Sequence, residues 1–243
     1  MKKVSFLFLL FISIVACSKK ESNLLVKGNI EGLKKGTLYL QKIDDTVLVN
    51  VDSVEITGDA NFILEDYIDS PQIMYLTLDK VDNEDYDDRI EFFAEKGEIT
   101  INTRLKNFQT DAKVAGSANQ EKLQDYRAMM KRFNDRNLEL IQKNFEAQRD
   151  KNEELLLAVD KEYDQLLKRK YLYTVNFAIT NKDLEIAPYL ALAEVFDANI
   201  KYLDTIYNSM TPPVQKSKYG KELKEFLKER REMEKLEEKV EDQ

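Results

Sequence analysis

The chain has 243 residues, with 45 acidic against 37 basic side chains and a formal net charge of −8. It contains no histidine and a single cysteine, which excludes Ser–His and Cys–His catalytic sites, redox dithiols and typical zinc sites. An acidic chain without a basic stretch is also a poor candidate for a nucleic-acid-binding protein, because such proteins neutralise phosphates with basic side chains. Catalysis would have to rest on residues such as Asp, Glu, Lys or Tyr, and the many carboxylates do not single out a pair.

The first residues have the pattern of a secretory signal. Two lysines precede an apolar run from Val4 to Val15 and a small residue. The run is too short to span a membrane, which takes about 20 residues. Ile14, Ala16 and Cys17 resemble the lipobox of bacterial lipoproteins. This resemblance implies a signal peptide at residues 1–16 and a lipid on Cys17, whereas a cleaved signal with a chance cysteine is the alternative.

Residues 17–23 are polar and predict a lipidated tether. Two or more acyl chains would hold the protein stably on a membrane. Lys19 and Lys20 occupy positions that acidic residues take in some surface-directed lipoproteins of the Bacteroidota. We therefore expect an outer-membrane lipoprotein that faces the periplasm, with exposure on the cell surface as the alternative.

Residues 24–116 alternate in short segments and predict an antiparallel β domain. Their β-branched and aromatic runs are bounded by Gly, Asp, Asn and Pro, as in strands separated by turns. Eight strands of this kind favour a β-sandwich or a strongly twisted sheet. They are expected at Leu24–Ile30, Gly36–Ile43, Val47–Ile56, Asn61–Glu65, Gln72–Asp79, Arg89–Glu95, Glu98–Arg104 and Asp111–Ala115.

An acidic segment, Asp79–Asp88, joins the fifth and sixth of these strands. Calcium prefers several carboxylate and carbonyl oxygens in a flexible loop. The segment lacks the glycine that an EF-hand loop needs at its sixth position. It therefore predicts a solvated loop, with a weak cation site as the alternative.

Residues 117–243 predict a helical domain. Ser117 and Gln120 fit a capping box at the start of a first long helix that runs to about Arg149. A second long helix follows a short turn, so two apolar stripes would face each other in an antiparallel hairpin. The expected stripes are Leu123, Tyr126, Met130, Phe133, Asn137, Leu140 and Phe145 on the first helix, and Val159, Tyr163, Leu166, Tyr173 and Phe177 on the second.

Shorter helices are expected around Tyr189–Ala198, with Pro188 in the first turn, and at Ile200–Met210. From Val214 to Gln243 the chain is densely charged with a thin apolar stripe. This pattern predicts a solvated helix, with a partner-binding helix as the alternative. The fold class is therefore α+β: an N-terminal antiparallel β-sandwich-like domain followed by an all-helical domain with a long helical hairpin.

Several ordered motifs in the β region resemble one family. They are Asp52-Ser53-Val54 with Gly58 and Phe62, then Phe92-Phe93-x-Glu95-x-Gly97-x-Ile99-x-Ile101, and Val114-x-Gly116-Ser117. The chain thus resembles a domain of unknown function (number 4369) that is common in envelope lipoproteins of the Bacteroidota, often ahead of a thioredoxin-like domain. Ala187–Ala193 and Tyr219–Leu223 are similar to the segment that usually follows, which extends the resemblance to about Phe226.

The chain also departs from that family. It has no tryptophan and no Trp-Cys-x-x-Cys motif, so redox activity is not implied, and the resemblance carries over no site residues. We expect a lipid-anchored envelope accessory or interaction protein without catalytic activity, cofactor or metal, with the membrane and an envelope protein as partners. The alternatives are a glycan- or peptide-binding module that uses a cleft between the two halves, and a carboxylate-based hydrolase. Tyr67, Tyr86 and Tyr219 are the tyrosines expected to be exposed.

Overall fold

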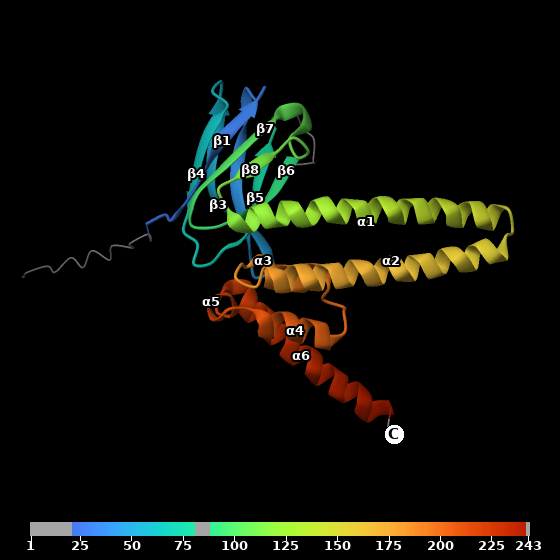
Figure 1. The fold of residues 1–243 in the computed structure, drawn as a ribbon. Coiled ribbons are helices and arrows are strands. Elements are labelled where there is room, and N and C mark those ends of the chain that lie inside the picture. The colour runs from blue at the N-terminus through green and yellow to red at the C-terminus, as the bar shows by residue number, and fades with distance from the viewer. Residues whose placement is uncertain (1–20, 81–87, 242–243) are drawn as a thin grey trace, which may run out of the picture.

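A computed structural model describes the main chain of residues 21–80 and 88–241 and side chains up to residue 236. A β domain lies at one end of the molecule, and two long helices run side by side away from it (Figure 1). The predicted signal peptide, residues 1–16, and Cys17 lie outside the described residues. No helix in the described part of the chain is long and apolar enough to cross a membrane.

Eight strands lie where the alternating pattern predicts them and form two four-stranded sheets. The sheet orders are β4-β1-β7-β8 and β3-β2-β5-β6. The strands are β1 (Leu24–Glu31), β2 (Lys35–Asp44), β3 (Val47–Thr57), β4 (Asn61–Asp66), β5 (Gln72–Asp79), β6 (Asp88–Ala94), β7 (Gly97–Arg104) and β8 (Lys113–Ala115). A short 3₁₀ helix, η1 (Leu105–Asn107), follows β7.

One strand pair differs from the expected antiparallel arrangement. β1 and β7 pair in parallel, from Leu24 opposite Gly97 to Glu31 opposite Arg104, whereas the other pairs are antiparallel. All four strands of the second sheet come between β1 and β7 in the sequence. A crossover, and not a hairpin, therefore connects β1 to β7.

The inner faces of the two sheets share one hydrophobic cluster, which makes the domain a β-sandwich. Val26 and Ile99 from one sheet and Leu40 and Leu76 from the other are fully buried there. β5 and β6 are buried on their outer faces as well. Phe92 points into the sandwich core, while its neighbour Phe93 packs against the helices.

The helical domain begins with the predicted hairpin. Its helices are α1 (Ala118–Arg149) and α2 (Glu153–Thr180), followed by α3 (Ile186–Glu194), α4 (Ile200–Ser209), α5 (Pro212–Gln215) and α6 (Lys218–Glu241). Together with the sandwich, these helices confirm the α+β class. At 1.5 Å per residue, α1 is roughly 48 Å long, so most of the hairpin extends beyond the β domain (Figure 1).

The capping box at the start of α1 is half formed. The Ser117 hydroxyl accepts the Gln120 N–H at 3.0 Å, as predicted. The Gln120 side chain does not return to the Ser117 N–H; its Oε1 accepts the buried Phe93 N–H of β6 at 2.7 Å instead. The capping box predicts that the Gln120 side chain accepts a hydrogen bond at the start of the helix. In the structure this side chain accepts a hydrogen bond from the sheet instead.

The hairpin stripes are only partly buried. Leu123, Tyr126, Met130 and Leu140 are buried, and Ala147 continues their row. Phe145 was expected in this row but is 67% exposed, because it lies five residues after Leu140, about 140° around the helix.

The charged C-terminal helix α6 is solvated only in its later part. Leu223 and Leu227 are buried in a cluster with α2, α3, α4 and α5, which corrects the expectation of a helix solvated along its whole length. Met233 and Leu236 are exposed, as expected of a charged helix.

Candidate functional site

The two halves of the chain meet at Asn119, whose side chain is completely buried. Its Nδ2 donates to Glu95 of the β6–β7 turn at 3.0 Å and to Glu185 before α3 at 3.1 Å. Its Oδ1 accepts the buried Ile186 N–H at 2.8 Å. One side chain thus ties the β domain, α1 and α3 together.

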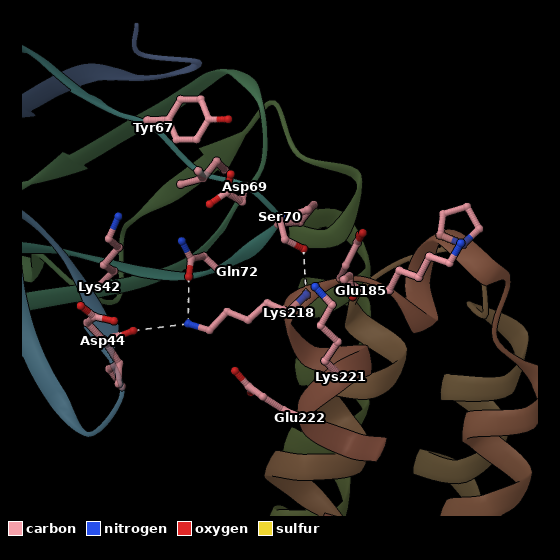
Figure 2. A pocket seen from close by; sticks show the side chains of 16 residues that line it. Lys42, Asp44, Tyr67, Asp69, Ser70, Gln72, Glu185, Lys218, Lys221 and Glu222 are labelled. Atoms are coloured by element: carbon pink, nitrogen blue, oxygen red, sulfur yellow. Dashed lines mark hydrogen bonds between the residues drawn. The ribbon is translucent and has the colours of Figure 1, made fainter. Parts of the chain in front are cut away.

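Beside this junction lies a groove of about 720 Å³, here called the interdomain groove (Figure 2). The end of β2, the β4–β5 loop, the segment before α3, and the α5–α6 region form its walls. Its lining residues are Lys42, Ile43, Asp44, Tyr67, Ile68, Asp69, Ser70, Pro71, Gln72, Glu185, Pro213, Lys216, Ser217, Lys218, Lys221 and Glu222.

Lys218 extends across this groove from the first residue of α6 (Figure 2). Its ammonium donates to the Gln72 side chain at 2.9 Å and to the Ile43 carbonyl at 3.3 Å. Its backbone N–H donates to the Ser70 hydroxyl at 3.1 Å. Neutral acceptors from the β domain therefore fix a cation that makes no ion pair with a carboxylate of another described residue.

A second cavity of about 420 Å³ adjoins the groove at Lys218, and Tyr75, Tyr189 and Tyr219 line it. The Tyr219 hydroxyl accepts the Ile73 N–H at 2.9 Å, and the Tyr219 ring packs edge-on against Phe93. Tyr219 is therefore partly buried at the domain interface, which corrects its predicted exposure. Burial raises the pKa of the Tyr189 and Tyr219 hydroxyls above the ordinary tyrosine value, so both are neutral donors near pH 7.

The charges around the groove fall into paired and unpaired groups. Lys42 forms a 2.8 Å ion pair with Asp66. Asp44, Lys216 and Lys221 make no side-chain hydrogen bond or ion pair with the described residues. Desolvation raises the pKa of the Glu222 carboxyl, and the nearby charge of Lys218 opposes this shift.

The other predicted site features lie elsewhere. Most of the Asp79–Asp88 segment, residues 81–87 with Tyr86, lies outside the described residues. At its ends, Lys80 pairs with Asp88 at 2.5 Å. Tyr67 lines the interdomain groove and is half-buried. Among the described residues no group of three or more acidic or cysteine side chains is placed to hold a metal ion.

A separate row of hollows, here called the hairpin groove, runs along α1 and α2 and ends beside α4. Hollows of about 230, 120 and 310 Å³ adjoin in sequence, the first two sharing Tyr163 and the last two sharing Leu167. The exposed apolar side chains along it are Phe145, Ile141, Tyr163, Leu167, Leu172 and Tyr202.

Asn137 lies in the middle hollow. Its Oδ1 is buried, and no other described residue donates a hydrogen bond to it. A buried acceptor without a donor is costly. The hairpin groove therefore contains a buried polar atom without a donor from the described residues, at the point where its two helices expose apolar surface.

Sequence reasoning missed the two grooves in different ways. The aromatic side chains of the hairpin are predicted to lie in the core. However, the sequence contains no further long apolar stripe that could cover Tyr163 and Leu167, and this could have indicated that they are exposed. No local signal marks Lys218, because its neighbours Ser70 and Gln72 lie about 146 residues away in the sequence.

Comparison with known proteins identifies the β domain. Residues 24–123 match the family described as "Domain of unknown function (DUF4369)". No curated protein and no solved structure matches the chain. The matched region contains all eight strands and ends early in α1. The remaining described residues form helices without a thioredoxin-like domain, consistent with the absence of its cysteine motif. Over its β domain, the chain is therefore similar to the DUF4369 family.

Proposed function

We propose that this protein is a lipid-anchored envelope accessory protein without catalytic activity, which binds a partner protein through its helical hairpin. The observation that carries the proposal is the hairpin groove, a series of three adjoining hollows with exposed apolar side chains on a segment that projects from the β domain. Contiguous apolar surface of this kind, on a soluble domain, marks interaction sites. The lipobox-like sequence ending at Cys17 supports the location.

The occupant that fits the hairpin groove is one amphipathic helix of another envelope protein. A groove between two parallel helix axes accepts a third helix, whose anchors recur at i, i+3, i+4 and i+7. Asp160 lines its outer part, Asp164 and Lys168 both line its inner part, and none of them makes an ion pair with a described residue. The partner helix should therefore carry a basic residue beside Asp160 and residues of both signs about 6–12 Å further along.

The part of the hairpin that is far from the β domain has only a small hydrophobic core of its own. Its own core contains only Leu140, Val159 and Leu166, with Phe133 and Leu155 beside them. Arg136 bridges the helices through Glu162 at 2.6 Å. A two-helix segment with so small a core gains from a third helix, because burial of apolar area is the main favourable term in association.

The test is a photo-crosslinking amino acid placed at Tyr163 in the lipidated protein in its own membranes. The matched control is the same amino acid at Asp135, which is exposed, lines none of the three hollows and lies about 200° around α1 from Asn137. We expect the Tyr163 position to crosslink to an amphipathic helical segment of another envelope protein, identified by mass spectrometry, and the Asp135 position not to do so.

Three results would contradict the proposal. Equal crosslinking from both positions would show that the groove is not selective. A crosslink to the hairpin of a second copy would identify a homodimer interface instead of a partner helix. Absence of crosslinks at Tyr163 would show that the groove is uncovered in the membrane. The anchor is tested separately with Cys17→Ala, which should lose the lipid label and leave the membrane fraction.

A further inference from the structure

We propose that the interdomain groove binds a short zwitterionic peptide, with its terminal carboxylate at Lys218 and Lys221 and its ammonium group at Asp44 and Glu222. This site is distinct from the hairpin groove, since the two have no lining residue in common.

The cationic pole is built from one face of α6. Lys218 and Lys221 are three residues apart, so they lie on the same side of the helix; both line the groove, and Lys218 reaches across it (Figure 2). Lys218 is held in place by Gln72 and the Ile43 carbonyl, which are neutral and leave its charge uncompensated at bonding distance. A carboxylate that reaches this ammonium would form a charge-assisted hydrogen bond with a donor that is already positioned.

Two carboxylates, one on either side of Lys218, form the anionic pole. Asp44 comes from the end of β2 and Glu222 from α6, and both line the groove. Neither forms an ion pair with a described residue, although Glu222 interacts electrostatically with Lys218. A ligand with only negative charge would be repelled by these two carboxylates, whereas a zwitterion places its ammonium group beside them.

The dimensions and the second cavity indicate the rest of the ligand. A volume of about 720 Å³ lies within the usual range of ligand pockets. The tyrosine-lined cavity of about 420 Å³ shares Ile43, Lys218 and Glu222 with the groove. A carboxylate at Lys218 therefore places the adjacent side chain of a peptide next to Tyr75 and Tyr189, which favours a C-terminal aromatic residue.

The chemistry favours a peptide over a glycan. Glycan sites present open aromatic faces, but Tyr189 and Tyr219 pack against each other at 5.4 Å and against Phe93. Unpaired groups of both signs are what peptide termini require, and uncharged sugars would leave those groups unused.

The test is calorimetric titration of the detergent-solubilised full chain with the dipeptide Ala-Phe. Its C-terminal amide and its N-acetyl derivative each remove one charge, and acetate supplies a carboxylate alone. We expect saturable binding of Ala-Phe, at least about tenfold weaker binding of each blocked dipeptide, and no measurable binding of acetate.

Variants test the residues. Lys221→Gln should weaken Ala-Phe binding about three- to tenfold and leave the affinity of the C-terminal amide unchanged, because the amide lacks the carboxylate that Lys221 contacts. The matched control is Lys224→Gln, which is exposed on the same helix and does not line the groove. Undetectable Ala-Phe binding, equal affinity for the blocked dipeptides or for acetate, or equal losses in Lys221→Gln and Lys224→Gln would each overturn the proposal.

Discussion

Replacement of Asn119 by alanine is expected to destabilise the junction between the two halves more than any exposed substitution on α1. The change deletes three hydrogen bonds and leaves the Ile186 N–H buried without an acceptor. An orphaned buried donor costs about 1–3 kcal/mol. The Glu95 and Glu185 carboxylates are partly exposed and can turn to water, so their loss adds less. We expect about 2–4 kcal/mol in all, or a fall in Tm of roughly 2–4 °C per kcal/mol.

The matched control is Asn134→Ala, the same substitution at an exposed position of α1 whose side chain makes no hydrogen bond with another described residue. Thermal and urea unfolding followed by circular dichroism give the free energy of unfolding. Hydrogen exchange at the Ile186 amide reports on the junction itself. If Asn119→Ala and Asn134→Ala differ by less than about 0.5 kcal/mol, and Ile186 stays protected, Asn119 does not hold the two halves together.

Three further predictions concern single positions. Asn137→Leu should raise the free energy of unfolding by about 1–3 kcal/mol, because it removes a buried acceptor without a donor; a lower Tm would refute this reading of Asn137. Gly220→Ala should lower the Tm, because a Cβ at this position would lie 2.0 Å from the Val214 carbonyl oxygen; an unchanged Tm would show that α5 and α6 are further apart. Glu222→Gln should gain stability relative to the natural protein as the pH rises above about 4.5, the ordinary glutamate pKa, because burial raises the pKa of Glu222 and the folded state loses stability when this carboxyl ionises. The titratable groups that line a cavity with Glu222 are Lys42, Asp44, Asp45, Tyr67, Asp69, Tyr75, Glu185, Tyr189, Lys216, Lys218, Tyr219 and Lys221. A stability difference between Glu222→Gln and the natural protein that is independent of pH would contradict the raised pKa.

The strands of the sandwich could be predicted because their signal is local. Alternation between buried and exposed positions locates β1 to β8 within a few residues. The parallel β1–β7 pair could not be predicted, because five other strands separate β1 from β7 in the sequence and only the crossover brings them together. The double phenylalanine at 92 and 93 shows the same limit: each residue is visibly apolar, but which hydrophobic layer each one enters depends on the helices.

The candidate sites could be predicted less completely than the fold, because they depend more on contacts between residues that are far apart in the sequence. Gln120 was assigned to a local cap, and its competing partner is the Phe93 N–H on another element. Tyr219 resembled an exposed residue in a charged stretch, but the Ile73 N–H and two aromatic rings surround it. The two helices of the hairpin were predicted correctly. Whether another helix covers their apolar surface depends on the whole chain and could not be predicted from the hairpin alone.

The most direct test of the partner-binding proposal uses thiol labelling. Cys17 is the only cysteine of the chain, so with its thiol lipidated an introduced cysteine is the only free one. Phe145→Cys places a thiol in the hairpin groove, and Asp135→Cys places one on the side of α1 that faces away from it. We expect maleimide to label Phe145→Cys much more slowly in native membranes than in the purified protein, and to label Asp135→Cys at the same rate in both. Equal rates for Phe145→Cys in the two settings would contradict the claim that a partner covers the hairpin groove.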